Sequence, residues 1–433
     1  MTLRVLFAIT ITLITLNVYT AGAETPVARV GSKVITLEEL NRALGSLPSG
    51  GPMTADEKLE RNARALEALK GMIDSELLYQ EARNAGALSS PEFVRKSNEY
   101  QDTVLADLYR RKLFDEKIKV VDADVDKLMA DRGVTKEAAT AILQSGKRKE
   151  LMMVETAILL EKYKVELSPD LAGKGEPSIK DSATLATGSF FNIKYGDVKE
   201  QAKRFGSDKA ALLEFVAGIV EEKIFAAEGR ANGLADIARY KEQVGEFDHS
   251  LAVNILRQRL DSQNEPSKKE VAAYIAANEF LKYQPRYAAA LMIVTKTKEE
   301  AETVRKKALA GGNFYELATK YSIAPDAQAN AGRLGMMTIG DRSYTVVDRA
   351  LLAEKTGGVT KPVQGPHGFS IFKLLEITGK KKRDDGEARE MARRALLEGK
   401  FEQYMDKLRK SGQVEIMQKE EAPAKPADSA ARQ

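Results

Sequence analysis

Residues 283–378 carry the pattern that most restricts how this chain can fold. The apolar run 287–294 (YAAALMIV) has the length of a β-strand, and residues 298–309 place apolar side chains at helical spacing. Gly311 and Gly312 end that helix, and Asn313 is a favourable cap for the next. The alternation then continues through a helix over 314–321, a strand within 331–337, a helix over 346–354, and strands over 359–363 and 369–375. We therefore expect one compact α/β module.

Three motifs in this module occur in the order and spacing of one known family. They are G-N-F-Y-E-L-A-x-x-Y-S at 312–322, A-G-R-L-G at 331–335, and T-K-P-V-x-x-x-x-G-F-S-I-F-K-L at 360–374. With these motifs the module resembles the parvulin (PpiC-type) family of peptidyl-prolyl cis-trans isomerases from end to end. The resemblance implies a small antiparallel sheet flanked by helices.

The catalytic residues of that family do not carry over to this chain. The positions that hold a histidine, a cysteine or aspartate, and a second histidine in parvulins match Leu291, Ala324 and Ser370. The chain has two histidines, and one of them, His249, lies outside the module, so a two-histidine network within it is impossible. We expect isomerase activity to be weak or lost. Full activity remains the alternative, because twisting an imide needs an apolar pocket but no nucleophile or metal.

The proline-binding pocket of the family maps onto largely different side chains here. Its aromatic floor matches Met336 or Met337, and the phenylalanine of the next helix matches Val347. His367 lies in the turn before the last strand, and Phe369 follows it at the start of that strand. We take these five residues as the candidate peptide-binding positions.

The first 23 residues have the pattern of a secretory signal peptide. Arg4 gives a positive start, 5–18 form an apolar stretch, and 21–23 (AGA) fit a cleavage site. The expected location is the periplasm, and an uncleaved membrane anchor is the alternative. The chain has no cysteine, so it needs no disulfide in an oxidising compartment.

The residues outside the signal peptide and the module are predicted to form helices in two related copies. Residues 71–86 are echoed by 218–233 at an offset of 147, with both end glycines matched, and 28–40 are echoed by 186–198. Residues 165–167 (VEL) are echoed by 414–416 (VEI) at an offset of 249, so the module is predicted to be an insertion in the second copy. The predicted division is a signal peptide (1–23), copy one (24–167), a linker (168–183), copy two (184–282), the module (283–378), the closing helix and strand of copy two (379–417) and a disordered tail (418–433).

Composition excludes several classes of function. Lys and Arg number 67 against 63 Asp and Glu, the net charge is +4 and tryptophan is absent, which argues against nucleic-acid binding. No phosphate-binding loop occurs, and two isolated histidines give no metal-ligand spacing, so we expect no cofactor and no metal. The basic run 380–383 is either a solvated joint or a contact for acidic partners or lipid headgroups.

The whole architecture resembles the SurA and PrsA group of exported parvulin-type foldases. The expected fold class is α+β, mostly α, with a tandem helical chaperone core and one inserted module. The resemblance implies a foldase that binds unfolded or extended client polypeptides of secreted or outer-membrane proteins, with no nucleic acid and with membrane contact only through residues 1–23. A fully active isomerase, and a secretion accessory with one dedicated partner, are the alternatives.

Overall fold

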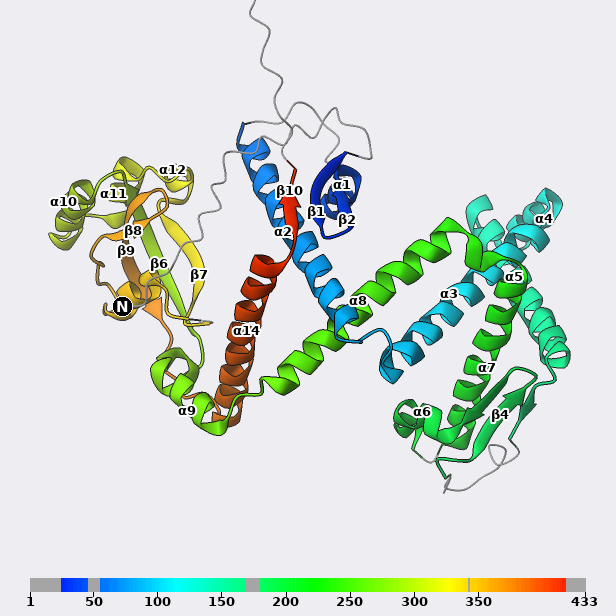
Figure 1. Ribbon diagram of the computed structural model, residues 1–433. Helices are drawn as coiled ribbons and strands as arrows, with labels where there is room; N and C mark the ends of the chain where they lie inside the picture. The colour runs from blue at the N-terminus through cyan, green and yellow to red at the C-terminus, as the bar shows by residue number, and fades with distance from the viewer. Residues whose placement is uncertain (1–24, 46–54, 169–179, 207, 342, 418–433) are drawn as a thin grey trace, which may run out of the picture. The chain divides into compact units, whose positions relative to one another are not determined.

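The computed structural model describes residues 25–45, 55–168, 180–206, 208–341 and 343–417. They form two compact units, Met1–Gln258 with Gly412–Gln433, and Arg259–Ser411, each described by itself below (Figure 1). The predicted signal peptide, most of the predicted linker and the predicted tail lie outside the described residues. Within the described part, no helix combines the length and apolar character needed to cross a bilayer.

The first unit is mostly helical. Its helices are α1 (Leu37–Leu44), α2 (Ala55–Asn84), α3 (Pro91–Lys117), α4 (Asp122–Arg132), α5 (Lys136–Lys162), α6 (Tyr195–Ala202), α7 (Lys209–Ala231) and most of α8 (Ala238–Gln263), with 3-10 turns at Lys203–Phe205 and Leu234–Asp236. Its strands are β1 (Pro26–Val30), β2 (Lys33–Thr36), β3 (Glu166–Leu167), β4 (Thr184–Gly188), β5 (Phe191–Lys194) and β10 (Val414–Ile416).

Each of two short hairpins pairs with a third strand, which comes from residues 414–416 for one hairpin and from the segment before the predicted linker for the other. The sheet orders are β10-β1-β2 and β3-β4-β5. Ala28 on β1 pairs with Ile416, and Ala186 on β4 pairs with Leu167. The VEL and VEI strands of the predicted repeat are therefore exchanged, because each pairs with the hairpin of the other predicted copy. The copy boundaries themselves stay a prediction.

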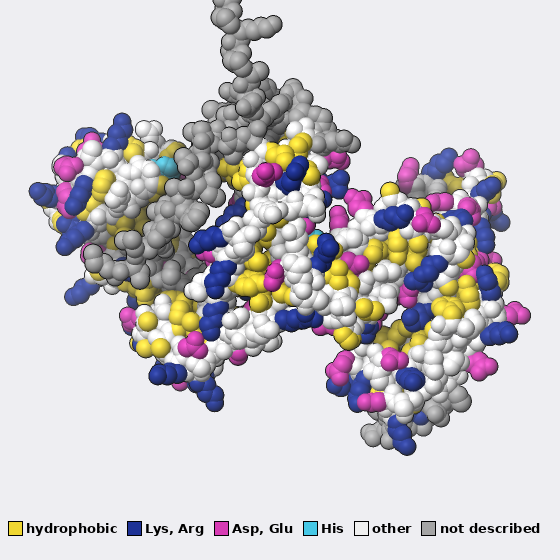
Figure 2. Space-filling view, in the orientation of Figure 1, with side chains coloured by type: hydrophobic (Ala, Val, Ile, Leu, Met, Phe, Trp, Pro, Cys, Tyr) yellow, Lys and Arg dark blue, Asp and Glu magenta, His cyan; other side chains and the backbone are white. Residues whose placement is uncertain are grey.

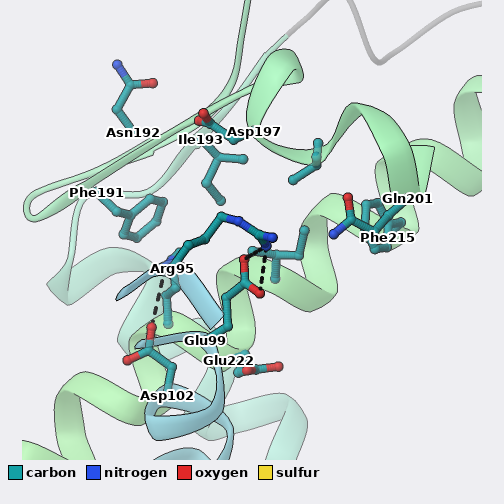
Figure 3. A pocket seen from close by; sticks show the side chains of 13 residues that line it. Arg95, Glu99, Asp102, Phe191, Asn192, Ile193, Asp197, Gln201, Phe215 and Glu222 are labelled. Carbon is teal, nitrogen blue, oxygen red and sulfur yellow. Dashed lines mark hydrogen bonds and ion pairs between the residues drawn. The ribbon is translucent and has the colours of Figure 1, made fainter. Parts of the chain in front are cut away.

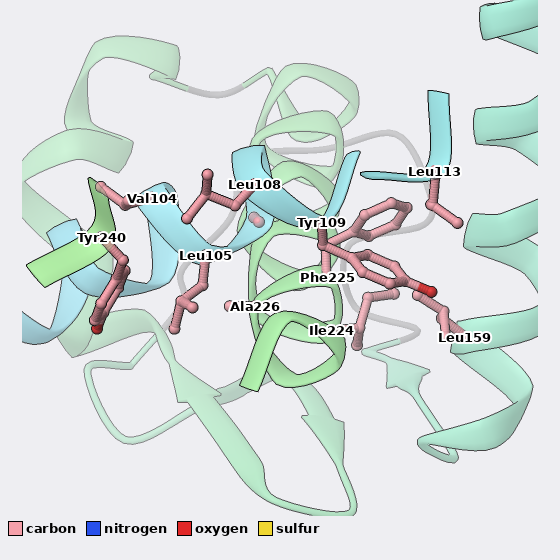
Figure 4. Packing of buried hydrophobic residues seen from close by; sticks show 11 residues of the cluster. Val104, Leu105, Leu108, Tyr109, Leu113, Leu159, Ile224, Phe225, Ala226 and Tyr240 are labelled. Carbon is pink, nitrogen blue, oxygen red and sulfur yellow. The ribbon is translucent and has the colours of Figure 1, made fainter. Parts of the chain in front are cut away.

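Helices α3 and α7 pack closely along each other and form the largest part of the core. Leu105 and Tyr109 on α3 meet Ile224 and Phe225 on α7, as Figure 4 shows. The helices approach so closely that a Cβ atom on Gly229 would lie 2.8 Å from the backbone oxygen of Leu105. This contact joins a helix of the first predicted copy to a helix of the second.

Helices α3 and α8 contact each other through two aromatic rings. The rings of Tyr100 and Phe247 stack with centroids 3.9 Å apart and planes 9° apart. These two residues are separated by the same offset of 147 that relates the repeats. In the predicted repeat, Tyr100 therefore contacts its own counterpart.

The α3–α7 and α2–α8 contacts correspond to each other in the predicted repeat, but their polar side chains differ. As α3 packs on α7, α8 contacts α2, where the ring of His249 stacks on Tyr79 at 4.3 Å and its Nε2 lies 2.9 Å from Ser75 Oγ. The counterpart of His249 at the offset of 147 is Asp102, which pairs with Lys223 at 3.4 Å and with Arg230. The two helix crossings therefore carry different polar partners.

The α2–α8 contact should weaken as the pH falls. Burial lowers the pKa of His249 from its ordinary 6.5, against the opposing effect of Glu76 and with a further lowering by Lys33. A basic group with a lowered folded pKa contributes stability that is complete above pH 6.5 and is lost as the pH falls through the folded pKa. Hydrogen exchange of α2 and α8 at pH 5 and 7.5, corrected for intrinsic rates, should show less protection at pH 5. H249Q should reduce that difference, and an unchanged difference in H249Q would rule out His249 as its source.

The second unit contains a four-stranded antiparallel sheet. Its helices are α9 (Lys268–Ala277), α10 (Lys298–Leu309), α11 (Phe314–Tyr321), α12 (Ala327–Asn330), α13 (Val346–Leu352) and α14 (Asp385–Ser411), with a 3-10 turn at Glu279–Lys282. Its strands β6 (Arg286–Thr295), β7 (Arg333–Ile339), β8 (Val363–Gly365) and β9 (Gly368–Ile377) lie in the order β7-β6-β9-β8. The predicted small antiparallel sheet with flanking helices is confirmed, as is the mostly helical fold class.

One strand of the module differs from its prediction. The pattern over 359–363 predicts a strand, but the structure has only an isolated bridge from Val359 to Lys373, and β8 starts at Val363. Thr360 explains the interruption, because its backbone N–H donates to the Phe372 carbonyl while its side chain accepts from the Phe372 N–H. A side chain thus replaces one rung of the ladder.

The sheet separates two clusters of buried side chains. Leu291 and Ile293 on β6 pack with residues of α10 and α11 on one face. Ala288 and Ala290 pack with Leu351 of α13 on the other. Asn313 caps the start of α11, and a Thr345–Asp348 capping box starts α13.

The basic run 380–383 is largely neutralised within the second unit. Lys380 pairs with Glu279 at 3.0 Å, Lys382 with Asp385 at 3.1 Å, and the buried Arg383 with Glu387. These ion pairs favour the first alternative, in which the run is a solvated joint, over a contact for lipid headgroups. On the face shown in Figure 2, basic and acidic side chains are interspersed over the described surface.

Candidate functional site

Two of the three parvulin catalytic positions lie on opposite faces of the sheet. Leu291 pairs with Lys373 and Ser370 pairs with Val294 in the same β6–β9 ladder, three rungs apart. Because side chains alternate between faces and cross-strand partners share a face, Leu291 and Ser370 point away from each other. Leu291 is 1% exposed in the α10–α11 cluster. These two positions therefore form no joint site.

The third position lies in the loop after α11. The side-chain oxygen of Ser322 accepts hydrogen bonds from the Val294 N–H at 3.1 Å and from the Ala324 N–H at 3.3 Å. This hydroxyl holds the loop against the end of β6. Ala324 itself is half-buried and has no functional group to offer a substrate.

The five predicted pocket residues are divided by the sheet. Met337 and Val347 pack against the cluster under α13, which is the face toward which Ser370 points. Phe369 packs against the opposite cluster, under α10 and α11. Met336 is 64% exposed, and His367 is exposed in the turn between β8 and β9. The structure thus brings Met337, Val347 and Ser370 to one face and leaves the others elsewhere.

This face offers apolar contact without acid–base chemistry. The side chains that line up on it from β6, β7 and α13 are alanine, leucine, isoleucine, methionine and valine. The group in this module whose pKa falls is Tyr321, where the Lys307 ammonium donates a hydrogen bond to the phenol oxygen. Tyr321 packs on the α10–α11 face, so the shift does not serve the predicted pocket.

Buried carboxylates occur in the first unit, and both are fully engaged in structural contacts. Glu155 accepts hydrogen bonds from Tyr109 at 2.8 Å and Lys117 at 3.0 Å. Glu228 accepts from Tyr163 at 2.7 Å and pairs with Lys162. Burial, reinforced by Glu228, raises the pKa of Tyr163 to about 12, and burial beside Glu155 raises the pKa of Tyr109. These pairs tie α5 to α3 and α7.

A groove in the first unit is the second candidate site, and the sequence did not point to it. Its volume is about 580 Å³, and it lies where β5, α6, α7 and α3 meet. Five apolar side chains line it: Phe191, Ile193, Val198, Phe215 and Ile219. Figure 3 shows Phe191 and Ile193 on the hairpin facing the Arg95–Glu99 pair across the opening. We call this site the α3–α7 groove.

A cavity of about 1080 Å³ lies in the second unit between α9 and α14. Its lining includes the apolar Val271 and Ile275. Charged neighbours on its rim are paired with each other, such as Arg393 with Glu265 at 2.9 Å. This pairing is typical of a packing joint.

Two family models match the chain. The model described as PPIC-type PPIASE domain covers residues 289–376, and the model described as SurA-like N-terminal domain covers residues 1–99. The resemblance that the motifs predict is therefore confirmed, in the module and at the N-terminus.

Curated relatives agree with these matches. Foldase protein PrsA 2 of Bacillus anthracis is 28% identical over 214 residues, 46% of this chain and 70% of that protein. Foldase protein PrsA of Geobacillus kaustophilus is 27% identical over 217 residues, 47% of this chain and 76% of that protein. A parvulin-like PPIase of Rickettsia typhi is 33% identical over 86 residues, 19% of this chain and 30% of that protein.

Solved structures show a more distant likeness. One, described among SurA-like chaperones of Campylobacter jejuni, is 20% identical and covers 53% of this chain and 96% of its own, with a TM-score of 0.26. PrsA of Bacillus anthracis is 21% identical and covers 60% and 93%, also with a TM-score of 0.26. At such scores the superposition carries no argument about function.

Proposed function

We propose that this chain, which carries a PPIC-type PPIase domain and a SurA-like N-terminal domain, is an exported foldase that holds extended segments of unfolded proteins and isomerises proline bonds weakly or not at all. The expected clients are secreted or outer-membrane proteins. Export is inferred from the signal-peptide pattern of residues 1–23.

The observation that carries the proposal is the loss of the polar network in the PPIase domain. Leu291 replaces one family histidine and is buried among apolar side chains, and Ser370 replaces the other on the opposite face. The face under α13 still presents Met337 and Val347 to a peptide. Methionine side chains adapt to varied partners, which suits binding without defined chemistry.

Holding is supported by the names of the relatives, which are foldases, and by the apolar lining of the α3–α7 groove. An unfolded segment loses conformational freedom on binding, so the affinity for any one client should be modest. Modest affinity lets clients leave and fold without an energy source such as ATP.

The test compares two activities of the full chain. We expect suppression of aggregation of an unfolded exported protein at near-stoichiometric amounts. We also expect the cis-trans exchange of an Ala-Pro peptide, measured by NMR exchange spectroscopy, to stay close to its uncatalysed rate, which is set by a barrier of about 18–20 kcal/mol. Absence of any suppression would overturn the holding function.

Clear acceleration of the exchange would instead support the alternative of an active isomerase. In that case M337D should abolish the acceleration, because a carboxylate on the α13 face opposes an apolar proline ring. Retention of the acceleration in M337D would place the active pocket elsewhere.

A further inference from the structure

We propose that the α3–α7 groove binds one extended segment of an unfolded polypeptide in which apolar side chains alternate with lysine or arginine. This inference rests on the proposed holding function and gives it a site in the first unit. It is carried by the floor of the groove, by the charge of its rim and by the free edge of β5.

The floor of the groove is apolar and partly open. Phe215 and Ile219 lie one helical turn apart on α7, and both are half-buried. Phe215 also contacts Phe205, with ring centroids 5.2 Å apart, which holds its ring in place. Phe191 contributes a third half-buried side chain from the hairpin. A client side chain placed here would remove these surfaces from water, which is the main favourable contribution to such binding.

Acidic side chains outnumber basic ones in the lining of the groove. Four acidic and two basic side chains line the groove: Glu99, Asp102, Asp197, Glu222, Arg95 and Lys223. Both basic groups are already paired, Arg95 with Glu99 at 2.9 Å and Lys223 with Asp102 at 3.4 Å. Two further cations contact lining residues: Arg230 pairs with Asp102, and the Arg204 guanidinium lies 5.3 Å from the centre of the Phe215 ring. Asp197 and Glu222 have no cationic partner among the described residues. They accept hydrogen bonds only from the Lys194 N–H and the Thr103 hydroxyl. Two uncompensated carboxylates beside apolar side chains favour a cationic, apolar segment.

The edge of β5 offers backbone contacts to an extended chain. In the sheet β3-β4-β5, β5 lies at the end, and the Tyr195 N–H donates to the Ala183 carbonyl across the hairpin. Alternate residues of an antiparallel strand direct their backbone groups to the same side, so Ile193 and Phe191 face β4 as Tyr195 does. The N–H and C=O of Asn192 therefore point outward, and Asn192 lines the groove. An added strand could pair there, as in β-strand addition.

The predicted repeat supplies an internal comparison. At the offset of 147, Phe215 and Ile219 correspond to Ala68 and Met72, and Glu222 corresponds to Ser75. Ala68 and Met72 pack against the cluster of the β1–β2 hairpin. On the helix that corresponds to α3, Glu242 forms an ion pair at 2.7 Å with Arg42 of α1. At this offset, the aromatic ring of Phe215 and the carboxylate of Glu222 therefore have no counterpart of the same kind, whereas Ile219 corresponds to another large apolar side chain, Met72.

The test measures peptide binding by fluorescence anisotropy at low salt, with the full chain. The probes are two dye-labelled nine-residue peptides with the same alternating leucines, one carrying lysines and the other glutamates between them. The wild-type chain should bind the lysine peptide more tightly, and added salt should reduce the difference. An exposed ion pair changes affinity by up to about fivefold, so reversing both carboxylates with D197K/E222K should weaken the lysine peptide by about tenfold or more. The glutamate peptide should gain affinity.

Two matched controls accompany this test. E214K/E246K makes the same change of net charge at two positions outside the groove and should alter affinity by less than about twofold. I219A shortens the floor without adding charge and should weaken both peptides, whereas V94A, at an exposed valine of α3, should weaken neither. If circular dichroism shows that D197K/E222K does not fold, I219A and V94A decide the question.

The outcomes separate the groove from the general function. Equal binding of both peptides by the wild-type chain, or affinities unchanged by both D197K/E222K and I219A, would overturn the groove while leaving the holding function intact if aggregation is still suppressed. If I219A loses both aggregation suppression and peptide binding, the result would support the groove and the holding function. A wild-type chain that suppresses no aggregation but binds the lysine peptide as described would overturn the proposed function and keep the groove.

Discussion

Replacing Gly229 with alanine is expected to destabilise the packing of α3 on α7 by about 2 kcal/mol, because inserting a methyl group into a packed contact typically costs 1–3 kcal/mol. The added Cβ would lie 2.8 Å from the Leu105 carbonyl oxygen and 3.1 Å from its Cβ. Both atoms belong to a helix in the core and have little room to move. The measurement is amide hydrogen exchange of α3 and α7 in the full chain, where about 2 kcal/mol corresponds to about thirtyfold faster opening.

The same substitution on the same helix provides the control. A methyl group added at Gly218 would meet no atom within 4 Å, and this glycine is exposed. Alanine is the better helix former by about 0.8–1 kcal/mol, so G218A should leave the protection unchanged or increase it. Equal effects of G218A and G229A would mean that helix propensity outweighs the close approach, and that α3 and α7 can separate to admit the methyl group.

The exchange of strands shows where prediction from this sequence stops. The two closing strands read Val165-Glu166-Leu167 and Val414-Glu415-Ile416, so they share one pattern and either could complete either hairpin. The predicted repeat rests on the offset and on the paired glycines, which are features of the sequence. Which strand joins which hairpin depends on tertiary packing, and this sequence pattern does not distinguish the two closing strands.

The two candidate sites also differ in how much of each could be predicted from the sequence. Motif spacing located Leu291 and Ser370, but the faces to which they point follow from the β6–β9 register, in which Leu291 pairs with Lys373 and Ser370 pairs with Val294. The α3–α7 groove was missed because four elements far apart in sequence build it. A signal was nevertheless present, since the repeat places phenylalanine and isoleucine at positions 215 and 219 where its first copy has alanine and methionine.

Restoring the first family histidine is expected to destabilise the PPIase domain and not to confer activity. Leu291 is 1% exposed and packs among isoleucine, valine, phenylalanine and alanine side chains. Histidine there would lose apolar burial and place two ring nitrogens among groups that cannot pair with them. Together these effects should lower the free energy of unfolding by about 3 kcal/mol. Hydrogen exchange of β6 and β9 in the full-chain L291H variant measures this loss.

Ser370 provides the matched control, because it is half-buried and faces the α13 side of the sheet. S370H should change the stability by less than about 1 kcal/mol, as is usual for partly exposed positions. Neither variant, nor the two together, should accelerate proline exchange, since the imidazoles would lie on opposite faces and could not share a proton. A stable double variant with accelerated exchange would contradict this prediction. It would mean that the two imidazoles can reach each other, and that the two substituted side chains alone account for weak or absent activity in the wild-type chain.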